Sequence, residues 1–306
     1  MNWLLIALIN PVSHSIANHL DKYLISKYIK GGSVGALILF STFFAVIFLP
    51  VLFFINPHIL SSVSLVQAIL LMINGALLAV AAICYLEALQ DEEASVVVPL
   101  LQLVPVISFI LGYWILDEKL GLIQIIAAIL IMVGSLLLSV QFKRRGEKLK
   151  MKLIVLMTFV SILCALNAVI FKIIAENQGF VDSLFWYMAG KFVFGILIYI
   201  FVRSYRKEFK LLMKRNSLAL ISLTTTVEIF SVIGDTAIVF AVLYAPVALV
   251  QAVSGLQPVF VLIIGVLLTL FLPKVAKESL KKRNLAQKVI GIIIITTGVL
   301  IIEFIK

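Results

Sequence analysis

Apolar segments about 20 residues long follow one another along almost the whole chain, separated by short polar connections. A helix needs about 20 apolar residues to cross a bilayer, and in lipid every backbone polar group must be paired within the protein. The pattern therefore predicts an all-α integral membrane protein and disfavours a β-barrel. We place ten transmembrane helices at about 3–28, 33–55, 65–90, 94–116, 120–141, 152–175, 183–202, 217–243, 247–272 and 288–305.

The composition excludes a soluble globular protein, because 63% of the residues are hydrophobic and only 13% are charged. The net charge of +10 does not indicate a nucleic-acid partner, since the basic residues lie in short runs between apolar segments. Membrane orientation explains these runs more simply. Both cysteines, Cys84 and Cys164, fall inside apolar segments, which indicates buried thiols and no disulfide.

The basic runs predict how the chain is oriented. Most lysines and arginines lie in the connections at 143–152, 203–215 and 274–288. Because basic loops stay on the cytoplasmic side, we expect these three in the cytoplasm and the protein in the cell (plasma or inner) membrane. With ten spans, both termini are then non-cytoplasmic. Residues 1–25 lack a basic n-region and carry polar interruptions, so we interpret them as a retained first helix and not as a secretory signal.

The second half of the chain repeats the first in degraded form. The pattern from Ala88 to Val106 returns from Ala241 to Val259, at an offset of 153 residues. Further pairs are Pro105 with Pro258, Gly134 with Gly298, and Lys22 with Lys172. Five spans in each half is an odd number, so the second copy enters the membrane with the opposite orientation. Inverted repeats of this kind are typical of secondary transporters, whose sites lie near the midplane.

This repeat divides the chain into a first five-helix repeat at 1–142, a basic cytoplasmic linker at 143–151 and a second five-helix repeat at 152–306. The stretch from Ala88 to Ser139 resembles the repeat of the drug/metabolite transporter superfamily, EamA-like branch. The resemblance rests on a small-residue run, a proline-containing helix, a glutamate at its end and a glycine-containing final helix, here Ala94, Ser95, Pro105, Glu118 and Gly134. In the second half only Pro258 and Gly298 remain, and Phe271 stands opposite Glu118.

The resemblance implies a ten-helix carrier that moves small solutes by alternating access. It does not fix the substrate, because members of the superfamily transport amino acids, sugars, nucleotide-related metabolites and drugs. The residues that bind solute or ion must be sought in the polar positions of the membrane segments.

Polar side chains recur on one face of the first segment. Asn10, His14, Asn18 and Asp21 follow at steps of 4, 4 and 3, with Lys22 beside them. An ionisable side chain at membrane depth costs about 2.5–3.5 kcal/mol on insertion scales, so each is a site hypothesis. We interpret the stripe as a cavity wall, with Asp21 as a proton or cation site and Lys22 as an anchor for an anionic group. The alternative is that Lys22 snorkels to the interface and Asp21 pairs with a neighbouring helix.

A second stripe lies in the eighth segment, where Thr224, Glu228, Ser231 and Asp235 follow at steps of 4, 3 and 4. A buried carboxylate that binds and releases protons near neutral pH is what proton-coupled exchange requires. The alternative is a pair of structural salt bridges to Lys172 or Lys191.

Four further residues are weaker candidates. Gln102 and Gln251 lie in the proline-broken fourth and ninth segments, where freed carbonyls are available to a solute, although helix–helix hydrogen bonding is the commoner use. Lys172 is a candidate central residue as the counterpart of Lys22, with snorkelling as the alternative. Glu118 precedes the fifth segment, and we interpret it as a structural cap at the N-terminus of that helix.

The sequence favours a secondary active transporter of a small polar metabolite, amino acid or drug-like solute, working by proton-coupled export or exchange. We expect no enzyme, metal or cofactor, because the chain has three histidines, no metal-spaced cluster, no nucleophile elbow and no phosphate loop. A membrane scaffold or receptor that retains the fold is the alternative, and a membrane-embedded enzyme is a third. A homodimer stays open.

Overall fold

The computed structural model of the chain describes residues 2–28, 34–91, 97–139, 151–214, 218–271 and 282–304. Every regular element in these ranges is helical, which confirms the predicted all-α fold for this part of the chain. The N-terminal part contains α1 (Trp3–Tyr28), α2 (Val34–Phe44), η1 (Ala45–Ile47), α3 (Phe48–Ile55), α4 (Ile59–Ser62), α5 (Leu65–Asp91), η2 (Val98–Gln102), α7 (Leu103–Leu116) and α8 (Leu122–Ser139). The C-terminal part contains α9 (Met151–Gln178), α10 (Phe180–Phe201), α11 (Arg203–Lys214), α12 (Leu218–Ala241), α13 (Val247–Ser254), α14 (Gln257–Phe271) and α15 (Lys282–Phe304).

Within the described ranges, six helical stretches are long and apolar enough to cross a membrane: Val34–Ile55, Leu65–Ala88, Met151–Gln178, Phe180–Phe201, Leu220–Ala241 and Val247–Leu268. Three more are apolar but shorter, at Leu100–Leu116, Leu122–Leu138 and Val289–Phe304. α1 occupies the range expected for the first segment and carries the polar stripe.

The break expected in the ninth segment is a turn at Gly255 and Leu256, which separates α13 from α14. One element differs from the expectation. The basic connection at 203–215, expected to be a loop, is mostly the helix α11. The physical reason is its alternation of basic and apolar faces, which favours a helix and which a hydropathy average does not register.

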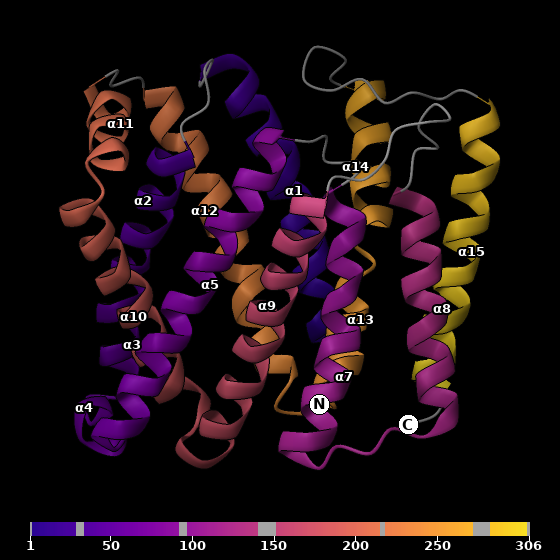
Figure 1. Cartoon of the computed structure of the whole chain (residues 1–306), viewed down its shortest axis with the longest axis horizontal. Helices are drawn as coiled ribbons and strands as arrows, with labels where there is room; N and C mark the ends of the chain where they lie inside the picture. The colour runs from indigo at the N-terminus through magenta and orange to yellow at the C-terminus, as the bar shows by residue number, and fades with distance from the viewer. Residues whose placement is uncertain are drawn as a thin grey trace.

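The helices stand side by side, with the two chain termini at one end of the bundle and α11 at the opposite end (Figure 1). α1 packs along α12, α8 along α15, and α5 contacts both α9 and α10. Gly179 is the single residue between α9 and α10. Its φ of 90° lies where residues with a side chain are strained, so glycine permits this tight turn.

Large apolar side chains lie on the outside of the bundle. Trp114 is 78% exposed, Phe54 81% and Leu70 43%, although each belongs to a helix. Apolar surface this extensive is expected where helices are surrounded by lipid. The helices therefore have apolar side chains on both their packed and their outward faces.

Gly134→Ala should lower the free energy of unfolding by about 1–3 kcal/mol, the usual range for overpacking. A Cβ at position 134 would lie 2.6 Å from Cγ1 of Ile295 and 2.8 Å from the carbonyl oxygen of Gly291, both in α15. Gly121→Ala is the matched control, because a Cβ there has only Gln124 Oε1, at 3.9 Å, as a neighbour. Thermal unfolding in detergent should separate the two variants, and equal midpoints would contradict the close contact of α8 and α15.

Candidate functional site

The two polar stripes predicted from the sequence meet where α1 packs on α12. The side-chain amide of Asn10 donates to the carbonyl oxygen of Gly234 at 3.0 Å. One turn further along α1, Nε2 of His14 lies 3.0 Å from Oδ1 of Asp235. Gly234 permits this approach, because a Cβ there would lie 3.0 Å from the His14 ring. The side chains of His14 and Asp235 remain 27% and 22% exposed, so the pair is not sealed by its neighbours.

Three further charged residues lie within electrostatic range of the His14–Asp235 pair. Lys191 of α10 is 7% exposed and interacts electrostatically with His14, Asp235 and Glu228. Glu228 is also 7% exposed, and its Oε2 atom has no hydrogen-bond partner within the described part of the chain. Asp21 interacts electrostatically with both Glu228 and His14. We call these five residues the central cluster.

The central cluster contains groups that can take up or release a proton and groups that can pair with a charged solute. One ammonium and one imidazole face three carboxylates inside a helical bundle, where each charge interacts more strongly than in water. The side chains of the central cluster can replace the hydration shell of a polar or ionic solute with fixed hydrogen-bond donors and acceptors.

The other stripe residues contribute less. Thr224 is buried, and its hydroxyl donates to the carbonyl of Leu220 at 2.8 Å within its own helix. Asn18 and Ser231 are partly buried, and no contact of either with the central cluster is seen in the described ranges. The position of the Lys22 side chain lies outside the described residues.

Three backbone carbonyls at and after the break in the ninth segment accept hydrogen bonds from side chains of other helices. Ser15 donates to the carbonyl of Gln257 at 3.1 Å, and His19 Nε2 lies 2.9 Å from the carbonyl oxygen of Val261. Ser135 of α8 donates to the carbonyl of Gly255. These three carbonyls therefore take part in helix–helix hydrogen bonds, which is the commoner use named in the sequence analysis.

The two glutamines of the broken segments also differ from one another. Gln102 is 9% exposed, and its Oε1 atom has no partner among the described residues. It lies against Gly255, since a Cβ at 255 would approach that oxygen to 2.8 Å. Gln251 is partly buried. The signature residues Pro105, Gly134 and Gly298 serve packing, because the first two are buried and a Cβ at 298 would lie 2.8 Å from the carbonyl of Ala127.

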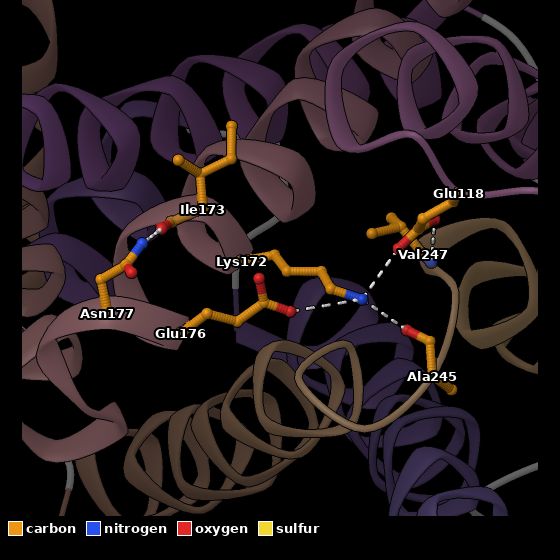
Figure 2. Close-up of polar contacts among 7 residues, drawn as sticks. All are labelled: Glu118, Lys172, Ile173, Glu176, Asn177, Ala245 and Val247. Atoms are coloured by element: carbon orange, nitrogen blue, oxygen red, sulfur yellow. Dashed lines mark hydrogen bonds and ion pairs between the residues drawn. The ribbon is translucent and has the colours of Figure 1, made fainter.

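A second charged group lies just after the end of α7, which is at the same end of the bundle as the termini (Figure 1), and its contacts are drawn in Figure 2. Lys172 Nζ is 2.8 Å from Oε1 of Glu118 and donates to the carbonyl oxygen of Ala245 at 2.9 Å. The other carboxylate oxygen of Glu118 accepts from the backbone N–H of Val247 at 2.9 Å. The side chains of Lys172 and Glu118 are only 10% and 13% exposed, and Figure 2 shows Lys172 pointing toward Glu118 and Ala245. We call this group the clasp.

The local sequence explains how Glu118 reaches the clasp. Asp117 ends α7 in the left-handed region, with φ 53°, and the N–H of Glu118 then bonds back to the carbonyl of Gly112 at 3.0 Å. A Cβ at Gly112 would lie 2.7 Å from Oε2 of Glu118, so glycine leaves room for the carboxylate. The interpretation of Glu118 as a cap on the fifth segment is wrong, because it satisfies the first N–H of α13 in place of α8.

The clasp also corrects the expectation for Lys172. It does not pair with Glu228 or Asp235, because its ammonium is taken up by Glu118 and Ala245, with Glu176 further away at 3.7 Å. The structure therefore brings His14, Asp21, Glu228 and Asp235 together and separates Lys172 from them.

Sequence reasoning did not select Lys191 or His19 as site residues. Lys191 is an isolated lysine in the middle of an apolar helix, which is itself a signal of function. His19 lies four residues after Ser15, and this spacing was a signal of a second polar face on α1.

Comparison with known proteins fits this geometry. Residues 1–140 match the EamA-like transporter family, of the drug/metabolite transporter superfamily. The resemblance predicted from the sequence is confirmed over that range, and the six long apolar helical stretches of the described residues agree with a multi-pass membrane protein. One crystal structure of a protein aligns with a TM-score of 0.67, covering 99% of this chain and 96% of that chain at 13% identity, which shows a shared fold. Among curated proteins, none matches the sequence.

Both charged groups include residues of the EamA-like region. His14 and Asp21 contribute to the central cluster and Glu118 to the clasp, while Glu228, Asp235 and Lys172 come from beyond residue 140. Each group therefore joins the matched region to the rest of the chain.

Proposed function

We propose that the protein is a secondary active transporter that moves a small polar solute across the cell membrane by alternating access. The observation that carries the proposal is the central cluster, in which three carboxylates, an imidazole and an ammonium lie between helices of the two halves. Charges inside a membrane bundle are expensive unless they serve transport or pair completely. Here one carboxylate oxygen of Glu228 lacks a partner among the described residues.

We further propose ten transmembrane helices arranged as two inverted repeats, at 1–142 and 152–306. The contacts support this division, because α1 packs on α12 and its counterpart α9 packs on α5. Both interfaces use an asparagine: Asn10 donates to Gly234, and Asn167 donates to the carbonyl of Asn74 at 3.0 Å. The pairing of α8 with α15 completes the symmetry, since each is the last helix of its repeat.

In this proposal the clasp closes the pathway at the end that holds the termini. Glu118 comes from the first repeat, whereas Lys172 and Val247 come from the second, so opening that end separates them. The solute then reaches the central cluster from one side at a time, as alternating access requires. Proton coupling rests on Asp21, Glu228 and Asp235, with His14 and Lys191 as the opposing groups.

The test is flux through purified protein in liposomes. Vesicles are loaded with labelled amino acids, sugars, nucleosides and organic acids, and counterflow and pH change inside the vesicles are recorded. We expect saturable exchange of one solute class. No flux of any solute and no proton movement, from protein that is folded, would favour the scaffold or receptor alternative.

Orientation has a separate expected result. In a chain without Cys84 and Cys164, a cysteine at Lys207 in α11 should be protected from membrane-impermeant thiol reagents in intact cells, whereas one at Lys119 should react. The two positions are exposed at opposite ends of the bundle (Figure 1). Reaction at position 207 and protection at 119 would reverse the proposed topology.

A further inference from the structure

The helix α11 has two chemically distinct faces. Tyr205, Phe209 and Leu212 are partly buried against neighbouring helices. The Phe209 ring contacts Phe43 of α2, with centroids 5.6 Å apart. This aromatic face fixes α11 against the bundle, so its opposite face is held in one place.

The opposite face is a basic stripe. Arg203, Lys207, Lys210 and Lys214 follow at steps of 4, 3 and 4, which places them on one side of the helix, and all four are exposed. With Arg206 and Leu211 they line an open hollow of about 360 Å³ on the surface of α11. In the part of the chain that the structure describes, none of the four stripe residues forms an ion pair.

Arg206 differs from the stripe residues because it binds backbone carbonyls of α10. Its guanidinium donates to the carbonyl oxygens of Tyr199 and Ile200, at 3.4 and 3.2 Å, and so satisfies the last turn of α10. This contact fixes the angle between α10 and α11. The four stripe residues, which have no such role, are free to meet a ligand.

The surroundings of the stripe indicate what that ligand is. The stripe begins next to the end of α10, where Ile200 and Phe201 are 52% and 77% exposed, and Leu211 in the hollow is 53% exposed. Basic groups next to exposed apolar side chains match a molecule that carries an anionic head on an acyl chain. A soluble anion or a nucleic acid would leave the apolar border unused.

We propose that the α11 stripe binds the phosphate headgroups of anionic phospholipids in the leaflet at that end of the bundle. Lys and Arg near an anionic membrane surface each strengthen the attraction about fivefold. The arrangement ties α11, and through Arg206 the end of α10, to the lipid surface. This property is separate from solute transport and does not depend on the substrate.

The test uses the full chain in a neutral detergent, titrated with dioctanoyl phosphatidylglycerol or dioctanoyl phosphatidylcholine and followed by native mass spectrometry. The wild type should bind the phosphatidylglycerol at least tenfold more tightly than the phosphatidylcholine. The fourfold variant R203Q/K207Q/K210Q/K214Q should lose this preference to within about twofold. The matched control K143Q/R144Q/R145Q/K148Q removes the same charge from another basic segment and should reduce the preference much less than the fourfold variant does.

Three outcomes would overturn the proposal: equal binding of the two lipids by the wild type, an unchanged preference in the fourfold variant, or an equal loss in the control. Inorganic phosphate tests whether the stripe binds a free anion in place of a lipid headgroup. If millimolar phosphate displaced phosphatidylglycerol, the stripe would be a soluble-anion site and the proposal would be wrong. If the fourfold variant does not fold, K207Q and K210Q serve singly, and each should weaken phosphatidylglycerol binding by two- to fivefold.

Discussion

Asp235→Asn should slow the initial rate of solute transport in liposomes by about 10- to 100-fold, while the protein remains folded. Hydrogen bonds to charged groups contribute about 1.5–3 kcal/mol, and 1.4 kcal/mol is a tenfold change. Asparagine keeps the size of the side chain and a hydrogen bond to His14, which lies 3.0 Å from the native carboxylate, but removes the charge. The rate is measured per folded protein, as judged by size-exclusion chromatography.

Asp182→Asn is the control for this variant. Asp182 is also a buried aspartate, 7% exposed, but it belongs to the first turn of α10 and accepts from Asn56 at 2.6 Å. Its replacement should leave the rate within about twofold. If both variants transported equally well, the central cluster would not be the site.

The second large effect concerns stability. Glu118→Gln should lower the free energy of unfolding by about 3–5 kcal/mol, because it removes the nearer and more buried charge partner of the Lys172 ammonium. Glutamine still accepts from the N–H of Val247, so the loss isolates the ion pair at 2.8 Å. Unfolding by a denaturing detergent, followed by circular dichroism, provides the measurement.

Glu176→Gln tests the same lysine from its other side. Glu176 lies 3.7 Å from Lys172 and is 45% exposed, and exposed pairs contribute about 1 kcal/mol or less. The two glutamate variants should therefore differ by several-fold in their loss of stability. Equal losses in the free energy of unfolding would mean that Glu118 stabilises the contact between the repeats no more than Glu176 does.

The sequence predicted which residues share a helix face, but it did not predict which faces contact one another. Periodicity placed Asn10 and His14 on one face of α1, and Glu228 and Asp235 on one face of α12, because a helical repeat depends only on local spacing. That these faces meet depends on long-range packing, which Gly234 permits and which no local pattern encodes. The sequence alone therefore could not predict that Asp235 pairs with His14.

The error at Glu118 has a similar cause. A glutamate before a helix is a local cap by rule, yet the left-handed turn at Asp117 directs the chain so that Glu118 reaches Lys172, 54 residues later. In the ninth segment the proline predicted a break, but it did not predict that the break is a two-residue turn at Gly255 and Leu256. Sequence patterns locate elements well and distant partners poorly.

The single-residue connection at Gly179 has a mechanical consequence. Domain hinges use a few residues that absorb backbone rotation, and between α9 and α10 there is only Gly179, with hydrogen bonds on both sides. We therefore expect the two helices to move together. Lys172 belongs to α9 and Lys191 to α10. In such a motion, release of Lys172 at the end of the bundle would be accompanied by a shift of Lys191 in the central cluster.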